Sequence, residues 1–352
     1  MQKIFFTPGP TQLYPNVAKY VKEALKEEVC SISHRGNEFQ QIFHNTIKSL
    51  RKVLRIPESY HVFFLSSATE AMERVIENLV AENSYHFVNG AFSERFFTIA
   101  QELGKSPMKC EAEWGKGFDF NEKIPDTEMI CFTQNETSTG TAIDLEDIYN
   151  IKKDHDDKII VADIVSSVPY VDIGYNKVDC AFFSVQKGFG LPAGLGVLIV
   201  NDKCIEKAQY LQDKNYDIGS YHSFPSLLKS ADKNQTPETP NVLGIYLLGK
   251  VCDELDKIGI GNIRKETEKK AQIIYDFFDA HVSYKPFVQN KGIRSKTVIT
   301  INVLNSAALI KKISDCSFVV GSGYKELKDR QIRIANFPMH KIEDVERMLK
   351  LI

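Results

Sequence analysis

The spacing of apolar and polar positions predicts short strands that alternate with amphipathic helices. Six apolar residues form one helical stripe in residues 37–54: Phe39, Ile42, Phe43, Ile47, Leu50 and Leu54. Three apolar runs of strand length follow, at 61–65, 84–89 and 128–133. Each run precedes a segment with helical periodicity, at 69–80, 93–103 and 145–154. Strand–helix alternation of this kind predicts an α/β fold with a mostly parallel sheet covered by helices.

The second half of the chain changes character. Three apolar runs lie close together, at 158–165, 180–185 and 195–200. A single long amphipathic helix is then expected from about residue 245 to residue 282. Further strands are expected at 297–303, 317–323 and 331–337. We therefore expect an extended arm over residues 1–15, a large domain over 16–250 and a small α+β domain over 251–352.

Composition narrows the function classes. The 352 residues are 43% hydrophobic and 26% charged with a net charge of -2, so no general nucleic-acid or membrane surface is expected. No apolar run reaches the roughly 18 residues that cross a bilayer, and residues 1–11 do not resemble a signal peptide. The seven cysteines form no CxxC pair. Free thiols in the cytoplasm are expected, and no metal site.

The stretch "SVQKGFGLPAG", residues 184–194, combines a lysine with glycines at the end of a predicted strand. Gly188, Gly190 and Ala193 have the spacing of a dinucleotide-binding turn, but that turn should open a helix. Pro192 interrupts the segment, and a strand-like run follows. A second phosphate-binding candidate, "QELGKS", lacks the first glycine of a P-loop, because that position is Ile99. A mobile surface loop and a covalent attachment point remain as interpretations of residues 184–194.

A lysine held among apolar strands loses hydration, so its pKa falls and its amine becomes nucleophilic. Such a lysine can form a Schiff base with pyridoxal phosphate (PLP), which also needs a carboxylate, phosphate ligands and a stacking partner. Candidates stand at other predicted strand ends: Asp163, Ser66, Ser67, Thr69, Asn135, Thr137 and Phe92. Each also has a structural interpretation, as a turn cap, a helix N-cap, a polar turn or a core phenylalanine.

Six motifs along the chain resemble those of class-V aminotransferases. They are "FTPGPT", "SHRGNEF", "NETSTG", "VAD", "QK" followed by "PAGL", and "RIANF", and they occur in the family's order. The resemblance implies the PLP-dependent transferase fold, with a large domain whose mostly parallel sheet is sandwiched by helices and a smaller C-terminal α+β domain. It also implies a homodimer whose active sites are completed by the partner chain, with amino-acid and keto-acid substrates.

The resemblance implies a role for each site residue. Lys187 would form the Schiff base, Asp163 would pair with the pyridine nitrogen, Thr137 would bind the ring hydroxyl and Phe92 would stack on the ring. The implied phosphate ligands are Ser67, Ala68 through its N–H, Thr69 and Gln186, with Gln235 and Thr236 from the partner chain. Arg333 in "QIRIANF" would bind the substrate carboxylate, because its planar fork suits that group. Its alternative is a solvent-facing arginine on an edge strand.

The stretch Ser33–Phe39 resembles the segment with which phosphoserine aminotransferases bind the substrate phosphate through a histidine and an arginine. His34 and Arg35 match, so phosphoserine:2-oxoglutarate transamination in serine biosynthesis is the favoured prediction. The chain departs from that pattern in two ways: no arginine stands in residues 66–73, and Phe92 replaces the usual tryptophan. Serine– or alanine–glyoxylate (or pyruvate) transamination is the second hypothesis. A cysteine desulfurase-like lyase and a non-catalytic relative are less favoured, the latter because Lys187, Asp163 and Arg333 occur together. A purely structural role for Ser33 as a helix cap is the alternative for this stretch.

Overall fold

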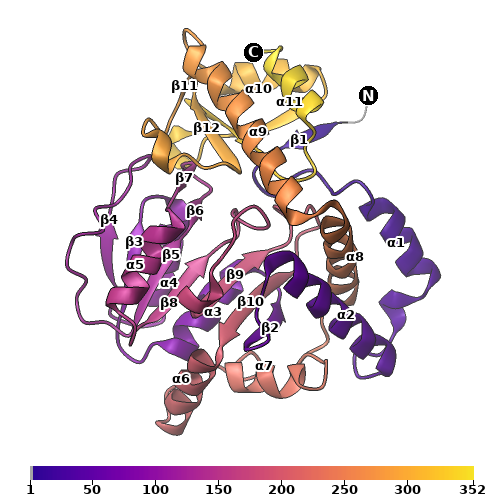
Figure 1. Ribbon diagram of the computed structural model, residues 1–352, viewed down its shortest axis with the longest axis vertical. Helices are drawn as coiled ribbons and strands as arrows, with labels where there is room; N and C mark the ends of the chain where they lie inside the picture. Colours follow the sequence, from indigo (N-terminus) through magenta and orange to yellow (C-terminus); the bar gives the residue numbers. More distant parts are fainter. Residues whose placement is uncertain (1–2) are drawn as a thin grey trace.

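The computed structural model describes residues 3–352 and contains a seven-stranded sheet in its larger lobe (Figure 1). The strand order is β2 (Tyr60–Leu65), β10 (Gly196–Asn201), β9 (Cys180–Ser184), β8 (Ile159–Asp163), β5 (Met129–Thr133), β3 (Ser84–Val88) and β4 (Met108–Glu111). Strand β10 is antiparallel to both neighbours, and the other pairings are parallel. The prediction of a mostly parallel sheet is confirmed. The carboxyl ends of six strands therefore meet at one edge.

Helices cover both faces of this sheet, which is why its strands are apolar on both sides. One face packs against α3 (Ala68–Leu79), α4 (Ala91–Glu102), α6 (Asp202–Asp213) and α7 (Phe224–Ala231). The other packs against α1 (Val17–Lys26), α2 (Asn37–Leu54), α5 (Leu145–Asp154) and α8 (Val242–Ile258). Strand β2 shows the division: Phe63 and Leu65 join the first core, while Val62 and Phe64 join the second.

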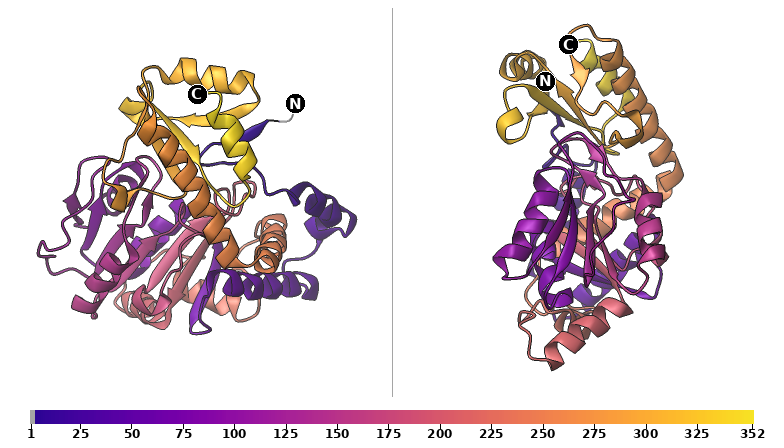
Figure 2. Two further views of the ribbon diagram at one scale, coloured as in Figure 1. Left: turned by 45° about the horizontal axis from the view of Figure 1, so that its top comes forward. Right: turned by 90° about the vertical axis from the view of Figure 1, so that its left-hand side faces the viewer.

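A second, five-stranded sheet forms the smaller lobe, seen at the top of Figure 1 and in side view in Figure 2. Its order is β1 (Ile4–Phe6), β13 (Phe318–Ser322), β14 (Gln331–Ala335), β12 (Val298–Asn302) and β11 (Lys285–Pro286). The core beside it contains residues of α9 (Ile260–Ala280), α10 (Ser306–Asp315) and α11 (Ile342–Leu349). Strand β1 pairs in parallel with β13, so Ile4–Phe6 lie beside Phe318–Val320.

Shorter elements connect these layers. They are the two-stranded ribbon of β6 (Asn135–Glu136) with β7 (Thr141–Ala142), and four single-turn 3-10 helices, η1 (Val29–Ser31), η2 (Tyr175–Lys177), η3 (Lys291–Ile293) and η4 (Lys325–Leu327).

The prediction of one continuous helix from about 245 to 282 is wrong. Helix α8 ends at Ile258 and α9 begins at Ile260. The break lies at Gly259, whose φ of 86° is a left-handed conformation that other residues adopt at a cost. Its N–H donates to the carbonyls of Leu255 and Asp256, which closes the end of α8. Periodicity alone did not show the break, because apolar residues continue at helical spacing on both sides.

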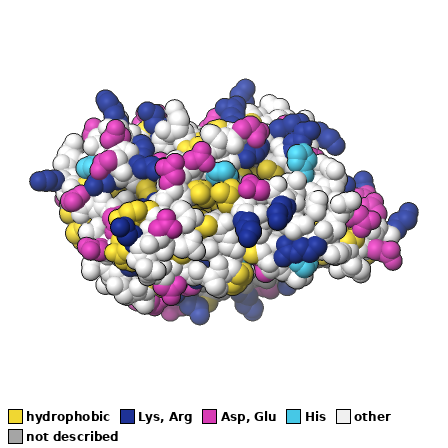
Figure 3. Space-filling view, turned by 90° about the horizontal axis from the view of Figure 1, so that it is seen from below, with side chains coloured by type: hydrophobic (Ala, Val, Ile, Leu, Met, Phe, Trp, Pro, Cys, Tyr) yellow, Lys and Arg dark blue, Asp and Glu magenta, His cyan; other side chains and the backbone are white. Residues whose placement is uncertain are grey.

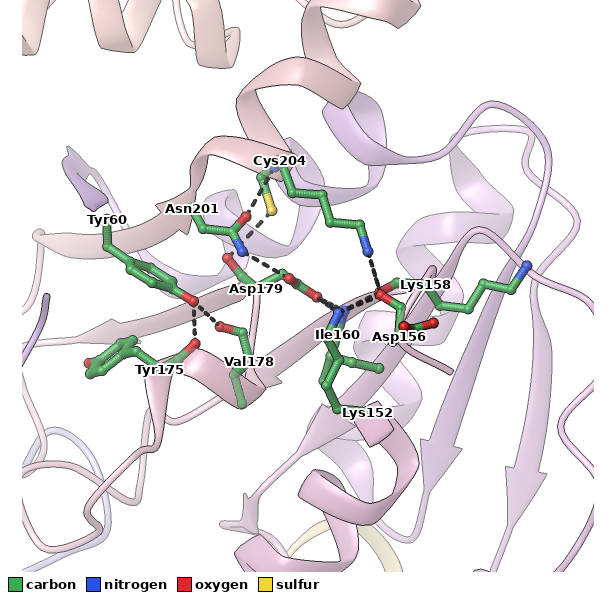
Figure 4. Close-up of polar contacts among 11 residues, drawn as sticks. Tyr60, Lys152, Asp156, Lys158, Ile160, Tyr175, Val178, Asp179, Asn201 and Cys204 are labelled. Carbon is green, nitrogen blue, oxygen red and sulfur yellow. Dashed lines mark hydrogen bonds and ion pairs between the residues drawn. The ribbon is translucent and has the colours of Figure 1, made fainter. Parts of the chain in front are cut away.

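A buried aspartate fixes the opposite, amino-terminal end of the sheet (Figure 4). Asp179 precedes β9 and is 5% exposed. Its carboxylate accepts hydrogen bonds from Lys152 Nζ, the N–H of Ile160 and the Asn201 amide, each at 2.8 Å. One carboxylate therefore ties α5, β8 and β10 together at this end of the sheet.

The face shown in Figure 3 carries Lys and Arg side chains intermingled with Asp and Glu. This distribution agrees with the small net charge of -2. Across residues 3–352 no helix combines the length and the apolar character needed to cross a membrane.

Candidate active site

Five predicted site residues follow the carboxyl ends of five strands of the large sheet. Ser67 follows β2, Phe92 follows β3, Thr137 follows β5, Asp163 ends β8 and Lys187 follows β9. All five strands run in the same direction, so the structure brings these positions to one edge. Ligands of open α/β sheets bind at this edge. The segment after Lys187 is a loop that leads into β10. This confirms the expectation, based on Pro192, that the segment does not open a dinucleotide-binding helix.

Lys187 is buried, with 6% of its surface exposed. Its amine donates to Thr137 Oγ1 at 2.7 Å and Ser166 Oγ at 2.8 Å, and it lies 5.0 Å from the centroid of the Phe92 ring. Burial lowers the pKa of Lys187 from 10.5 to about 8, and the nearby carboxylates of Asp163 and Glu136 limit that fall. At pH 7 about a tenth of the amine is then unprotonated, the form that a nucleophile requires.

Asp163 is 3% exposed at the end of β8. Burial raises its pKa to about 7, against the opposing effects of the Val165 N–H and of Lys187. The N–H of Val165 donates to Oδ1 at 2.9 Å, so the carboxylate does cap a turn. That single bond leaves Oδ2 for another donor. A buried carboxylate with spare acceptor capacity suits the protonated nitrogen of a heterocyclic ring.

Two further residues complete the surroundings of the amine. Ser166, 1% exposed, hydrogen-bonds Thr137 as well as Lys187. The Tyr324 ring lies 5.7 Å from the Phe92 ring and 5.4 Å from the Arg333 guanidinium carbon. Sequence reasoning missed Ser166 and Tyr324. The only available signal for Ser166 was its position three residues after Asp163, and Tyr324 lies far away in the sequence.

Arg333 approaches the same edge from the small lobe. It lies on β14, between β13 and β12, so the alternative of an edge-strand arginine is wrong. Its Nε donates to the Ser322 carbonyl at 2.8 Å and its Nη1 to the Thr137 carbonyl at 3.2 Å. Burial lowers its pKa without bringing it near neutrality, because guanidinium stays charged in proteins. The site therefore holds a fixed cation with further N–H groups for a carboxylate.

Three of the predicted phosphate ligands, Ser67, Ala68 and Thr69, stand at the N-terminus of α3. Ser67 is the N-cap, and its Oγ accepts the Glu70 N–H at 3.1 Å, so the N-cap interpretation also holds. The Ala68 N–H donates to Ser184 Oγ at 2.7 Å, while Thr69 is exposed in the first turn. Gln186 is half-buried, and its carbonyl accepts the Thr11 N–H at 3.2 Å. A helix N-terminus with hydroxyl groups is an anion site, although a phosphate at the Ala68 N–H would have to replace Ser184.

The remaining predicted residues form a second group, separate from these contacts. Arg35 Nη1 donates to Gln235 Oε1 at 3.1 Å and to the Thr236 carbonyl at 2.6 Å, and Nη2 donates to the Pro237 carbonyl at 2.7 Å. His34 is half-buried beside Arg35. The helix-cap alternative for Ser33 is wrong: α2 begins after Gly36, and Ser33 Oγ accepts the Arg35 N–H. Residues 34–35 and 235–237 thus behave as one structural unit.

A histidine that the sequence reasoning passed over connects this unit to α3. His222 is 4% exposed and bonds Glu70 through Nδ1 and Glu238 through Nε2, the latter at 2.8 Å. Burial opposes its charge, but the two glutamates outweigh burial and raise the pKa of His222 to about 9. Burial acts to raise the pKa of Glu70, but its hydrogen bonds with His222 and Ser66 outweigh this effect and lower the pKa to about 2.

Fold and site together define a class of enzyme that works through a lysine at the carboxyl edge of a mostly parallel sheet. The residues present fit PLP: a buried lysine with a lowered pKa, a buried carboxylate with a free oxygen, an aromatic ring within 5.0 Å of the amine and a capped helix N-terminus. The model of the family "Aminotransferase class-V" matches residues 4–91 and 113–317. The chain belongs to the class-V aminotransferases, and its cofactor is PLP.

Known proteins resemble the whole chain. A solved structure of a phosphoserine aminotransferase SerC from Cytophaga hutchinsonii is 44% identical, with a TM-score of 0.97 and coverage of 99% of this chain and 98% of that one. The phosphoserine aminotransferase of Rhodococcus opacus (strain B4) is 27% identical over 99% of this chain and 93% of its own. An alanine–glyoxylate aminotransferase from Nostoc sp. has a TM-score of 0.83 at 20% identity, covering 100% and 94% of the two chains, which supports the fold alone.

Proposed function

We propose that this enzyme transfers the amino group between phosphoserine and 2-oxoglutarate, as a cytoplasmic homodimer acting in serine biosynthesis. The observation that carries the substrate is the 44% identity, over nearly the full length of both chains, to a phosphoserine aminotransferase. The arrangement of Arg35 is compatible with it. This exposed guanidinium is held by Gln235 and by two backbone carbonyls, so a cation is preorganised for an anion such as phosphate.

The proposed mechanism assigns work to the buried groups around Lys187. PLP supplies an electron sink for the negative charge that develops at the substrate Cα. The Lys187 amine would hold the cofactor covalently and, once displaced by substrate, would take the proton from Cα and return one at the end of the transfer. Thr137 and Ser166 would orient this amine, since both hydroxyls already bind it. The Asp163 carboxylate would hold the proton of the pyridine nitrogen.

The remaining roles concern binding. Phe92 would stack on the ring, and Ser67, Ala68, Thr69 and Gln186 would bind the cofactor phosphate. Arg333 would bind the substrate carboxylate. In the proposed dimer, Gln235 and Thr236 would reach the partner's cofactor. Because Arg35 is hydrogen-bonded to both of these residues, His34 and Arg35 would be delivered to the same partner site, where they would bind the substrate phosphate.

A single-turnover amine panel tests the substrate. The PLP-loaded enzyme is mixed separately with phosphoserine, serine, alanine and glutamate, and the change in the cofactor's visible absorbance is timed. We expect phosphoserine to react about a hundredfold faster than serine or alanine, because one or two charge-assisted bonds to phosphate contribute roughly 3 kcal/mol. Faster reaction of serine or alanine would refute the substrate and favour a glyoxylate- or pyruvate-using transaminase.

An Arg35→Gln variant adds the matched control. Its rate with phosphoserine should fall much further than its rate with alanine, because alanine carries no second anionic group for Arg35 to bind, whereas any loosening of Gln235 and Thr236 affects both substrates alike. Equal losses on both substrates would contradict the proposed role of Arg35. Sedimentation of the same preparations tests the proposed dimer directly.

A further inference from the structure

A buried carboxylate next to the site has no part in the mechanism above. Glu136, on β6, is 0% exposed. Its Oε1 accepts the Ser138 N–H at 3.0 Å and the Ser138 hydroxyl at 2.7 Å. Its Oε2 accepts the Ser93 N–H at 2.9 Å and the Ser93 hydroxyl at 3.0 Å. The Phe92 N–H lies 3.1 and 3.3 Å from the two oxygens. Because backbone N–H groups can only donate, this position requires an acceptor on both oxygens.

Glu136 caps the N-terminus of α4, because the N-cap residue of this helix has no capping side chain. The N-cap of α4 is Gly90, which has no side chain, although the first N–H groups of a helix need acceptors. Glu136 takes the N–H groups of Phe92 and Ser93, and Ser138 Oγ takes that of Ala91 at 2.9 Å. A negative charge at this end of a helix is also favoured by the helix dipole.

The packing shows that Gly90 and Glu136 depend on each other. A Cβ at residue 90 would lie 2.3 Å from Glu136 Cγ and 2.5 Å from its Cδ, well inside van der Waals contact. The glycine therefore serves close approach rather than an unusual backbone angle. Any larger residue at position 90 would push the carboxylate away from the N–H groups that it binds.

Phe92 connects this cap to the reacting groups. Its backbone N–H is bound by Glu136, and its ring lies 5.0 Å from the Lys187 amine and 5.7 Å from the Tyr324 ring. The charge of Glu136 also acts directly on the site. It favours the protonated forms of Lys187, Arg333 and Asp163. The carboxylate thus affects both the position of the ring and the charge balance around the amine.

We propose that Glu136 is a positioning residue for the cofactor: it fixes the Phe92 ring by capping α4 and supplies the buried negative charge that balances the cations of Lys187 and Arg333. The proposal deepens the proposed function, because it rests on the assignment of Lys187 and Phe92 to the cofactor site. Its charge component can be measured on the full-length protein before PLP is added.

The test compares Glu136→Gln with Ser138→Ala. Both variants weaken the cap of α4, but only E136Q removes the charge. The first readout is the pH dependence with which an amine-reactive anhydride labels Lys187 in PLP-free protein, quantified by mass spectrometry. We expect the midpoint, about pH 8 in the wild type, to move lower in E136Q and to stay in place in S138A. The second readout is PLP affinity, which should fall at least about tenfold in E136Q, since the amide NH2 cannot accept the hydrogen bonds that one oxygen accepted.

An unchanged labelling midpoint in E136Q, or an equal shift in S138A, would overturn the proposal, and so would wild-type PLP affinity in E136Q. Should E136Q not fold, Glu136→Asp separates the charge of residue 136 from its capping of α4. The labelling midpoint should stay near that of the wild type, because the charge is kept. PLP affinity should fall, because the shorter side chain does not reach the Phe92 N–H. A shifted midpoint in E136D would refute the charge component. Failure of the wild type to attach PLP at Lys187 would refute the proposed site instead, and the labelling profiles would still report on Glu136.

Discussion

Replacing Lys187 by methionine should stabilise the PLP-free protein while it destroys cofactor attachment. Methionine matches the length of the lysine stem and needs no hydrogen-bond partner. The two groups that bind the amine, Thr137 Oγ1 and Ser166 Oγ, already hydrogen-bond each other, so neither is left unpaired. The substitution therefore removes a buried cation without creating a new unsatisfied group.

The size of the effect follows from the pKa of Lys187. Its fall from 10.5 to about 8 corresponds to about 3 kcal/mol against the charged folded state. Below pH 8 the folded protein holds the ammonium and the full cost is present. Between pH 8 and 10.5 the folded state loses the proton before the unfolded state does, so the cost declines, and above pH 10.5 it is gone. Loss of the cation raises the pKa of Asp163 further, which adds a smaller cost at alkaline pH.

Urea unfolding of PLP-free wild type and K187M at pH 7, 9 and 10.5 measures this difference. We expect K187M to gain about 2–3 kcal/mol at pH 7 and to lose this advantage by pH 10.5. Lys270 provides a matched control, because burial lowers its pKa to about 8 as well. Its amine donates to the carbonyls of Phe337 and His340, at 3.0 and 2.6 Å. The Phe337 carbonyl also accepts the His340 N–H, but Lys270→Met removes the donor from the buried His340 carbonyl and should therefore give no gain. Lower stability of K187M at pH 7, or an advantage that does not change with pH, would refute the reasoning.

Three other predictions concern separate parts of the molecule. Arg333→Gln should lower kcat/KM about a hundredfold for every amino substrate, with PLP affinity unchanged, because carboxylate recognition is common to all; a loss confined to phosphoserine in steady-state assays would contradict this. His222→Gln should lower the free energy of unfolding by up to about 3 kcal/mol below pH 6.5, and this loss should disappear as pH rises through about 9, because folding raises the pKa of His222. A stability difference in urea that is constant with pH would disprove this. Gly259→Ala should cost about 1 kcal/mol at its φ of 86°. Gly261→Ala, inside α9 with open space around it, should gain about 0.5 kcal/mol, and equal unfolding midpoints for both alanine variants would count against the explanation of the helix break.

The strands and the positions at their ends were predictable because their signals are local. Each buried strand of a parallel sheet is a short apolar run, and a polar residue directly after it stands at the carboxyl edge. Asp163, Thr137 and Lys187 could be singled out in this way, and the structure brings all three to one edge. Their roles toward the cofactor stay predictions from the family resemblance.

The residues that sequence reasoning missed depend on contacts between distant segments. Ser166 and Tyr324 are an ordinary serine and an ordinary tyrosine until the fold places them beside Lys187 and Phe92. Glu136 looked like part of a polar turn, and only packing shows that it caps a helix 45 residues earlier. His222 became notable because its two glutamates lie on α3 and in the 235–240 segment.

The sequence by itself determined the order of strands and helices, the α/β class and the set of polar residues at the strand ends, because apolar periodicity and chain direction act over a few residues. Only the tertiary structure decided which of these residues share a site and which protonation state each of them favours there. Burial depends on what the rest of the chain packs around a group, so the lowered pKa of Lys187 and the raised pKa of Asp163 exist only in the folded protein. The same holds for the break at Gly259 and for the grouping of Arg35 with residues 235–237, since each depends on contacts or backbone angles that no local pattern records.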